Sequence, residues 1–169
     1  MMNSLKLASV NIHGLRNSTK RKTFFRYLKK GAFDIISIQE SYITDADKEM
    51  WEREWGGSLF YTSVTGHSMG QIILVRKNFP FDVQCVFKND RILTVRVVLS
   101  NNEMYVTNVY APTTSSNKGT FLHNLYEHIH TLNSVYQIVC GDFNCVLDNE
   151  LDIISGDQQE ILTSLMILC

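Results

Sequence analysis

The 169-residue sequence has few of the features that mark disordered or membrane-spanning chains. It contains two prolines, 20% charged residues and no low-complexity run, which together exclude an intrinsically disordered chain. No apolar stretch approaches the length of a membrane span, and residues 1–6 lack the apolar core of a signal peptide. Because 44% of the residues are hydrophobic, we expect one soluble, intracellular domain over residues 1–169, with no membrane partner.

Cysteine is also scarce, and its spacing excludes two kinds of structural site. The cysteines form no CxxC pair and no Cys/His pattern suited to zinc, and each stands in an apolar run. We therefore expect buried thiols in a reducing compartment and no disulfide framework. The four cysteines are Cys85, Cys140, Cys145 and Cys169. The histidines of one predicted helix are likewise expected to be surface or packing residues; they are His123, His128 and His130.

Acidic residues are absent from the start of the chain. Residues 1–30 contain eight Lys and Arg and no acid, a charge of +8, so a total charge of −1 leaves −9 for the remainder. A polyanion would be attracted to this end, with binding that weakens as the salt concentration rises. A solvated helix face is the alternative interpretation of the same charges.

The spacing of apolar residues predicts alternating strands and helices. A strand over residues 5–11 is followed by a helix that Ser18 or Thr19 caps and that runs to Lys30. A strand over residues 34–40 then completes a βαβ-like unit. Short turns between later strands imply antiparallel pairing. The other predicted elements are a helix capped within residues 44–47, strands over 58–64, 71–75, 81–88, 91–99, 104–109 and 136–140, and helices over 119–133 and 159–169.

Polar side chains stand where several of these strands end. Beyond Gly141, alternation along the chain would let Asp142 and Asn144 face one pocket while Phe143 turns into the core. An Asx turn at Asp142 is the alternative there. The complete set of strand-end residues is Asn11, Glu40, Tyr110, Asp142 and Asn144. Together with the basic end of the chain, this set predicts a metal-assisted site acting on a phosphate ester, and its oxygen ligands suit Mg²⁺ or Mn²⁺.

Two of these strand-end residues also have ordinary interpretations. Glu40 could be a surface glutamate before the following helix, and Tyr110 could be a buried aromatic residue with a bonded hydroxyl. A third pattern, over residues 66–70, matches the G-x-S-x-G turn of serine hydrolases but precedes a predicted strand instead of the required helix. We therefore expect a hairpin loop there, whose backbone N–H groups are candidate phosphate contacts.

Five short motifs, taken in order, resemble those of the endonuclease/exonuclease/phosphatase family, and in particular the endonuclease domain of LINE-type non-LTR retrotransposon reverse-transcriptase polyproteins. The likeness extends from Leu5 to at least Asp152. The motifs are Val10-Asn11-Ile12-His13-Gly14-Leu15, Gln39-Glu40, Gly66-His67-Ser68-Met69-Gly70, Asn108-Val109-Tyr110-Ala111-Pro112 and Gly141-Asp142-Phe143-Asn144.

The resemblance implies an α/β fold, the DNase I-like four-layer sandwich of two mainly antiparallel sheets with helices outside. It implies a nuclease that nicks one DNA strand with water and bound Mg²⁺ or Mn²⁺, without a small-molecule cofactor. The nick would leave a 3′-hydroxyl that primes reverse transcription. Such a protein would act in the nucleus on chromosomal DNA and would be joined to the rest of a larger polyprotein.

The resemblance also implies roles for individual residues. Glu40 would hold the metal ion, and Asn11 would help to place it. Asp142 would orient or deprotonate the attacking water, Asn144 would hold the scissile phosphate, and Tyr110 would donate to a phosphate oxygen. The candidate nucleic-acid contacts are Arg16, Lys20, Arg21, Lys22, Ser68 and Arg91.

The sequence departs from the family pattern in four places. Val10 replaces the usual tryptophan, Ser41 replaces the usual threonine, and Gln71 stands where an apolar strand residue is usual, which is expected to weaken that strand. The family's C-terminal Ser-Asp-His motif is missing, because the last histidine is His130. We therefore expect a C-terminally truncated domain with little or no nuclease activity. The alternatives are an inactive remnant that binds nucleic acid and a phosphatase of the same fold.

Overall fold

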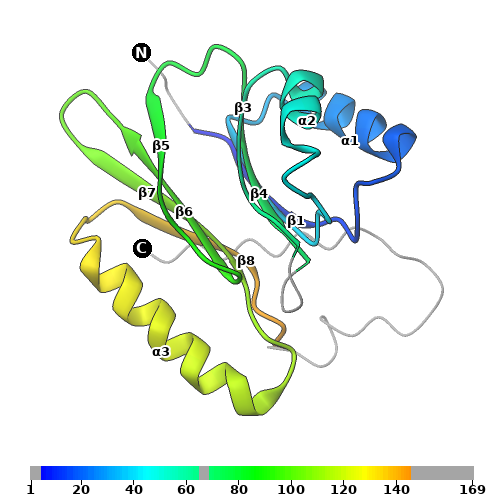
Figure 1. Ribbon diagram of the computed structural model, residues 1–169. Coiled ribbons are helices and arrows are strands. Elements are labelled where there is room, and N and C mark those ends of the chain that lie inside the picture. Colours follow the sequence, from blue (N-terminus) through cyan, green and yellow to red (C-terminus); the bar gives the residue numbers. More distant parts are fainter. Residues whose placement is uncertain (1–4, 65–68, 146–169) are drawn as a thin grey trace.

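The computed structural model describes residues 5–64 and 69–145, which form two four-stranded sheets packed face to face (Figure 1). The first sheet has the order β1-β2-β4-β3 and the second the order β5-β6-β7-β8. Helices α1 and α2 cover the outer face of the first sheet, and α3 covers the outer face of the second. The predicted DNase I-like four-layer sandwich is therefore confirmed. The elements are β1 (Leu7–Asn11), α1 (Ser18–Lys30), β2 (Ile35–Gln39), α2 (Lys48–Trp55), β3 (Ser58–Thr62), β4 (Gln71–Val75), β5 (Asp82–Lys88), β6 (Ile92–Val98), β7 (Glu103–Tyr110), α3 (Ser115–Thr131) and β8 (Gln137–Asp142).

Each sheet contains one parallel strand pair, and this arrangement positions the polar strand ends. Strands β1 and β2 are parallel and are joined through α1, and β7 and β8 are parallel and are joined through α3. The other neighbouring strands are antiparallel. The short turns predicted this for strands consecutive in the chain, but not for the pair of β2 with β4. Because parallel strands end at the same edge of a sheet, each sheet brings two strand ends together.

The core is layered because strands at the centre of the first sheet are buried on both faces. Ile35 and Ile36 are consecutive, and each has 0% of its surface exposed. Ile36 packs toward the helices with Phe25 and Trp51, whereas Ile35 packs between the sheets with Val95. Strands with two buried faces favour apolar residues on both, and β2 and β4 are buried along their whole length. The polar exceptions are Ser37 and Gln39 in β2 and Gln71 in β4.

Gln71 is the exception within β4. Its side chain is fully buried, and neither of its polar atoms has a hydrogen-bond partner among the described residues. The strand nevertheless pairs with β3 along its whole length, and the Gln71 backbone N–H donates to the Thr62 hydroxyl at 3.1 Å. The expected weakening therefore does not break the strand, and a buried amide of this kind lowers stability without changing the pairing.

Helix boundaries differ from the predictions at two points. The N-cap of α1 is Asn17, whose side chain accepts from the Lys20 N–H at 2.9 Å, so the predicted capping by Ser18 or Thr19 is wrong by one or two positions. Helix α3 begins at Ser115, before the predicted start at Gly119. Gly119 is exposed and has open space around its Cα, so the helix tolerates it at a modest cost.

Arg21 lies inside the fold and not on a DNA-facing surface. Only 2% of this residue is exposed, and its Nε donates to Glu54 at 2.7 Å. Its Nη1 donates to the Leu15 carbonyl at 2.9 Å, and the guanidinium lies 4.8 Å from the centre of the Trp51 ring. Arg21 therefore links α1 to α2, and its prediction as a nucleic-acid contact is wrong.

The cysteine prediction holds for one of the three described thiols. Cys140 is buried, whereas Cys85 and Cys145 are exposed, so burial was wrongly predicted for these two. Cys85 lies on the edge strand β5, next to a register shift, where one face of the strand is open to solvent. Cys169, the helix predicted over residues 159–169, and residues 66–68 lie outside the described residues. No helix within residues 5–64 and 69–145 is long and apolar enough to cross a membrane.

Candidate active site

The structure brings four of the predicted strand-end residues into one hydrogen-bonded group. Asn11 ends β1, Glu40 follows β2, Tyr110 ends β7 and Asp142 ends β8. The Asn11 side-chain nitrogen donates to Glu40 Oε1 at 3.0 Å and to Asp142 Oδ2 at 2.8 Å. The Tyr110 hydroxyl donates to Glu40 Oε1 at 3.0 Å. One amide therefore links a carboxylate of the first sheet to a carboxylate of the second.

Backbone geometry holds these residues at the sheet edge. Glu40 has a φ of 52°, which is uncommon for a glutamate and turns the chain sharply at the end of β2. Gly141 has a φ of 139°, and a Cβ there would lie 2.1 Å from the Val109 carbonyl oxygen. Only glycine fits this close approach of β8 to β7, so Gly141 is required to place Asp142.

The surroundings set the protonation of Glu40 and Tyr110. Burial acts to raise the pKa of Glu40, but hydrogen bonds from Asn11, His13 and Tyr110 outweigh it, so the pKa lies below its usual value. Burial, followed by the hydrogen bond to Glu40 and the charges of Glu40 and Asp142, raises the pKa of Tyr110 to about 12. At neutral pH the site therefore contains an ionised Glu40 and a phenol that keeps its proton.

At Asp142 the structure contains the Asx turn that was the alternative interpretation, and the alternation predicted from an extended chain through Asn144 is wrong. Its Oδ2 accepts from Asn11, and its Oδ1 accepts from the Asn144 backbone N–H at 2.9 Å, which is an Asx turn. Asn144 has a φ of 48°, so the chain is no longer extended there, and its amide nitrogen donates to the Ala111 carbonyl at 2.7 Å. Phe143 packs against the core beneath α3, as predicted.

His13 and Lys118 join the site, although the motifs assigned neither of them a role. His13 Nδ1 lies 2.9 Å from Glu40 Oε2, and the His13 side chain is 76% exposed. The Lys118 ammonium donates to the Asn144 carbonyl and so fixes the start of α3 to the segment after β8. The position of His13, two residues beyond Asn11 and next to Gly14, was the only signal in the sequence for its location.

A buried polar network supports the site from between the sheets. Gln39 Nε2 donates to Asn108 Oδ1 at 2.6 Å and to the Ser9 hydroxyl at 3.2 Å. Asn108 Nδ2 donates to the Ile38 and Ile72 carbonyls at 3.0 and 3.2 Å. Because Asn108 lies on β7 while its partners lie on the first sheet, the network fixes the sheets relative to each other.

The candidate nucleic-acid contacts differ in their relation to this site. The Arg16 Nε donates to the Tyr42 carbonyl at 3.1 Å, and the Lys20 ammonium donates to the Ile12 carbonyl at 2.7 Å. Both side chains therefore flank the loop that contains His13. The Lys22 side chain is 60% exposed on α1, and the Arg91 guanidinium lies 5.3 Å from the centre of the Tyr110 ring. Ser68 falls outside the described residues.

The donor atoms of the site fit a hard divalent cation. Glu40 and Asp142 place two carboxylates around the Asn11 amide nitrogen, and the Asn11 side-chain oxygen, Oδ1, accepts from the His13 backbone N–H at 3.2 Å. Among the described residues, no cluster of three or more His, Cys, Asp and Glu forms a metal site by itself. Mg²⁺ commonly binds through one or two carboxylates, with water and substrate phosphate completing its coordination, so the oxygen-rich set is sufficient.

The sheet order and the constellation at the strand ends define a phosphodiesterase-like α/β sandwich. Residues 8–151 match the model of the Endonuclease/Exonuclease/phosphatase family. The match covers most of the chain, which therefore belongs to this family, and the resemblance found in the motifs is confirmed.

Individual relatives place the chain near retrotransposon proteins. It is 29% identical over 148 residues to the Transposon TX1 uncharacterized 149 kDa protein of Xenopus laevis, covering 86% of this chain and 11% of that protein. The endonuclease domain of TRAS1, a telomere-specific non-LTR retrotransposon, superposes with a TM-score of 0.64 at 16% identity, covering 85% of this chain and 60% of that one. D. rerio TDP2 complexed with a single-strand DNA product gives a TM-score of 0.56 at 17% identity, covering 84% and 61%.

Proposed function

We propose that the chain is part of a metal-dependent DNA endonuclease of the retrotransposon type. The observation that carries this proposal is the Asn11 amide, which joins Glu40 of one sheet to Asp142 of the other at 3.0 and 2.8 Å. Such a group assembles a metal-binding carboxylate and a water-orienting carboxylate at one point. The basic first 30 residues, with a charge of +8, favour a polyanionic substrate.

Each residue of the site would have its own role in hydrolysis. Glu40, with Asn11 beside it, would hold Mg²⁺ or Mn²⁺, whose positive charge would offset the charge that builds on the phosphate. Asp142 would accept a proton from the attacking water while the water oxygen bonds to phosphorus. The P–O3′ bond breaks, and the departing O3′ takes a proton from solvent to become the 3′-hydroxyl. Asn144 has two amide N–H groups, of which Ala111 takes one, so the second is available for a phosphate oxygen.

Tyr110 supplies the remaining donor. Because its pKa is raised to about 12, the phenol stays protonated through the neutral range. Its one O–H donates to Glu40 in this structure and would turn to a phosphate oxygen when substrate binds. The product would be a nicked strand with a 3′-hydroxyl, suited to priming reverse transcription. This role implies action on chromosomal DNA in the nucleus, within a longer polyprotein.

The 169 residues contain no histidine after His130, so the family's Ser-Asp-His motif is not among them. The second candidate is an inactive remnant that binds nucleic acid, which the charge of +8 on the first 30 residues supports. A phosphatase of the same fold is the third, and a panel of phosphoinositide and phospholipid substrates separates it from a nuclease.

A plasmid-nicking assay with Mg²⁺ tests the proposal. It compares the 169-residue chain with a chain extended through a Ser-Asp-His motif, and both with their Glu40→Gln and Asp142→Asn variants. We expect the extended chain to nick and each variant to lower its rate by about 100-fold or more. Glu49→Gln, at an exposed position of α2, is the matched control. Nicking that survives Glu40→Gln, or no nicking by the extended chain, would refute the proposal.

A further inference from the structure

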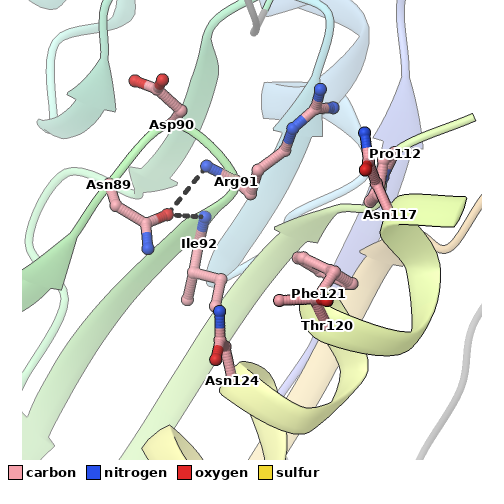
Figure 2. A pocket seen from close by; sticks show the side chains of 9 residues that line it. All are labelled: Asn89, Asp90, Arg91, Ile92, Pro112, Asn117, Thr120, Phe121 and Asn124. Carbon is pink, nitrogen blue, oxygen red and sulfur yellow. Dashed lines mark hydrogen bonds between the residues drawn. The ribbon is translucent and has the colours of Figure 1, made fainter.

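A cavity of about 710 Å³ opens beside the candidate active site (Figure 2). On one side lies the turn between β5 and β6, and on the other lies the first half of α3. Ile92 and Phe121, which are 2% and 7% exposed, form an apolar floor. The residues that line the cavity are Asn89, Asp90, Arg91, Ile92, Pro112, Asn117, Thr120, Phe121 and Asn124.

The α3 side of the cavity is a single helix face. Asn117, Thr120, Phe121 and Asn124 recur at intervals of three and four residues, so their side chains point toward the same side of the helix. This spacing sets two amides and one hydroxyl above the buried ring of Phe121. The helix itself is held near the active site because Lys118 donates to the Asn144 carbonyl.

The opposite wall is a preorganised turn. The Asn89 side-chain oxygen, Oδ1, accepts from the backbone N–H groups of Arg91 and Ile92 at 2.8 Å each, and Figure 2 draws both hydrogen bonds as dashed lines. With its oxygen engaged, Asn89 presents its amino group as a donor. The turn therefore offers a fixed donor across the cavity from the α3 amides.

The charges in the cavity determine which class of ligand fits. Arg91 contributes one positive charge and Asp90 one negative charge, so the cavity as a whole does not favour a bare phosphate. An apolar floor surrounded by amide donors and acceptors suits a flat ring with a polar edge, which is the chemistry of a nucleobase. Asparagine, like glutamine, pairs with adenine through two hydrogen bonds.

Arg91 connects this cavity to the catalytic residues. Its Nη1 donates to the Tyr110 carbonyl at 3.4 Å, and its guanidinium lies 5.3 Å from the centre of the Tyr110 ring. The Tyr110 hydroxyl in turn donates to Glu40 at 3.0 Å. A nucleotide with its base in the cavity would therefore have its phosphate near Arg91 and the adjoining phosphodiester near Tyr110.

We propose that this cavity, the base pocket, binds one unpaired nucleobase of the DNA strand directly beside the phosphodiester that the active site cleaves. The inference rests on the proposed function in taking DNA as the ligand. The base is unpaired because the pocket surrounds it from two facing walls and a floor, whereas a paired base exposes only one edge in a groove.

Binding without turnover tests this inference. The 169-residue chain is titrated with short single-stranded DNA in EDTA, where metal-dependent cleavage does not contribute, and fluorescence anisotropy gives the affinity. A second series moves one abasic position along the same oligonucleotide. The variants are Asn117→Leu and Asn124→Leu, which replace exposed amides that line the pocket, and Thr120→Val, which removes only the hydroxyl. Asn101→Leu, at the exposed turn between β6 and β7, is the control.

Each pocket leucine variant should weaken binding of intact DNA by about tenfold, and Thr120→Val by a smaller factor, while Asn101→Leu leaves binding unchanged. At one position along the oligonucleotide, the abasic site should weaken binding to the wild type by about the same factor as a leucine variant does. It should cause no further loss of affinity in Asn117→Leu or Asn124→Leu. Thermal melting confirms that each variant folds.

Equal binding of intact DNA by the wild type, the leucine variants and Thr120→Val would overturn the base pocket. Weakening that is independent of the abasic position would also overturn it. A failure of the proposed function would be seen in a different measurement, as nicking that is absent or that does not depend on Glu40. If the extended chain nicks DNA but its affinity does not depend on the abasic position, only the base pocket is refuted. If the affinity depends on the abasic position but the extended chain does not nick, only the nuclease proposal is refuted.

Discussion

Several residues around the active site adopt backbone conformations that are uncommon for their side chains. His13, Glu40, Tyr42 and Asn144 have φ values of 48°, 52°, 60° and 48°. Asparagine adopts this region readily, whereas a glutamate or tyrosine there costs about 1 kcal/mol or more. Backbone hydrogen bonds offset the cost, including Gly14 N–H to the Glu40 carbonyl at 2.6 Å and Tyr42 N–H to the Met69 carbonyl at 2.8 Å. This concentration of strain supports a functional role for the edge where these residues lie.

His128 provides a test at the residue scale, through the pH dependence of stability. Its Nε2 lies 2.8 Å from the Thr94 hydroxyl and its ring 4.2 Å from that of Phe87, and burial lowers its pKa below the usual 6.5. The unfolded chain therefore binds more protons than the folded chain near and below pH 6.5. The contribution of this residue is complete above pH 6.5 and is lost as the pH falls toward the lower, folded pKa.

Urea unfolding at pH 7.5 and pH 5.5 measures this effect. We expect the wild type to lose stability at the lower pH and His128→Gln to lose less. His123→Gln, an exposed substitution on the same helix, should follow the wild type. An identical pH dependence in the wild type and His128→Gln would show that His128 stays uncharged or equally solvated in both states.

The strand-end residues could be predicted from the sequence because each depends on local order. Asn11, Glu40, Tyr110 and Asp142 each follow an apolar run, and the end of a strand is a local property. His13 could not be given a role in this way, because its contact with Glu40 depends on a positive φ and on the neighbouring strand. The position of Lys118 likewise depends on how α3 docks.

The burial of Arg21 was indicated by the helical spacing of α1, but this signal did not enter its prediction as a nucleic-acid contact. With Phe24, Phe25 and Leu28 it occupies the intervals of three, four and seven residues that define the buried face of α1. The surrounding basic residues suggested a charged surface, although the spacing alone predicted burial. The energetic partner, Glu54, lies 33 residues away on α2 and could not be identified without the fold.

At the scale of the element, the Arg21 ion pair should stabilise the packing of α1 on α2. Arg21→Met removes the nearer cation from Glu54, whose side chain is 18% exposed, and leaves it only the exposed Lys22 ammonium at 3.9 Å, so it should lower the free energy of unfolding by about 3 kcal/mol. Lys22→Met, at a side chain that is 60% exposed, should change it by less than about 1 kcal/mol. Urea unfolding measures the free energy of unfolding of both variants. Equal decreases would show that the charge of Arg21 adds no stability beyond the packing that a methionine side chain also provides.

The extent of α3 illustrates why helix ends were less predictable than helix faces. Its apolar face, which includes Phe121 and Leu125, was evident from spacing and is buried as expected. Its start was misplaced because glycine usually marks a boundary. A Cβ added at Gly119 would meet no atom within 4 Å, so no tertiary contact requires a glycine there. The only cost of Gly119 inside the helix is its low helix propensity.

At the scale of the whole molecule, the uneven charge should determine how DNA binding responds to salt. Arg16→Gln and Lys22→Gln each remove an exposed charge from the basic end. Each should reduce the slope of log affinity against log salt by about 0.7 to 0.9 for every phosphate that the charged side chain neutralises. Lys77→Gln, an equal charge change at an exposed position just after β4, should leave the slope nearer to that of the wild type. Anisotropy titrations across a range of salt concentrations measure the slopes, and equal changes in all three variants would show that only net charge matters.

The layered fold was predictable from the sequence to the extent that neighbouring strands pair with each other. Short turns predicted the antiparallel pairs, and residues 5–40 predicted a βαβ-like unit. The insertion of β4 between β2 and β3 was not predictable, because that order depends on contacts between distant segments. That residues 1–169 form one domain stays a prediction, and the polar network of Gln39 and Asn108 links only the two described sheets.

The Asn11–Asp142 hydrogen bond spans 131 residues, and this separation determines when the site can exist during folding. Contacts between distant segments form late, because a long loop must close before any interaction rewards it. Strand β8 is the last described strand and is reached only through the α3 crossover. A chain still emerging from the ribosome therefore has Glu40 without Asp142. The order of synthesis therefore keeps the two carboxylates apart until β8 has been made.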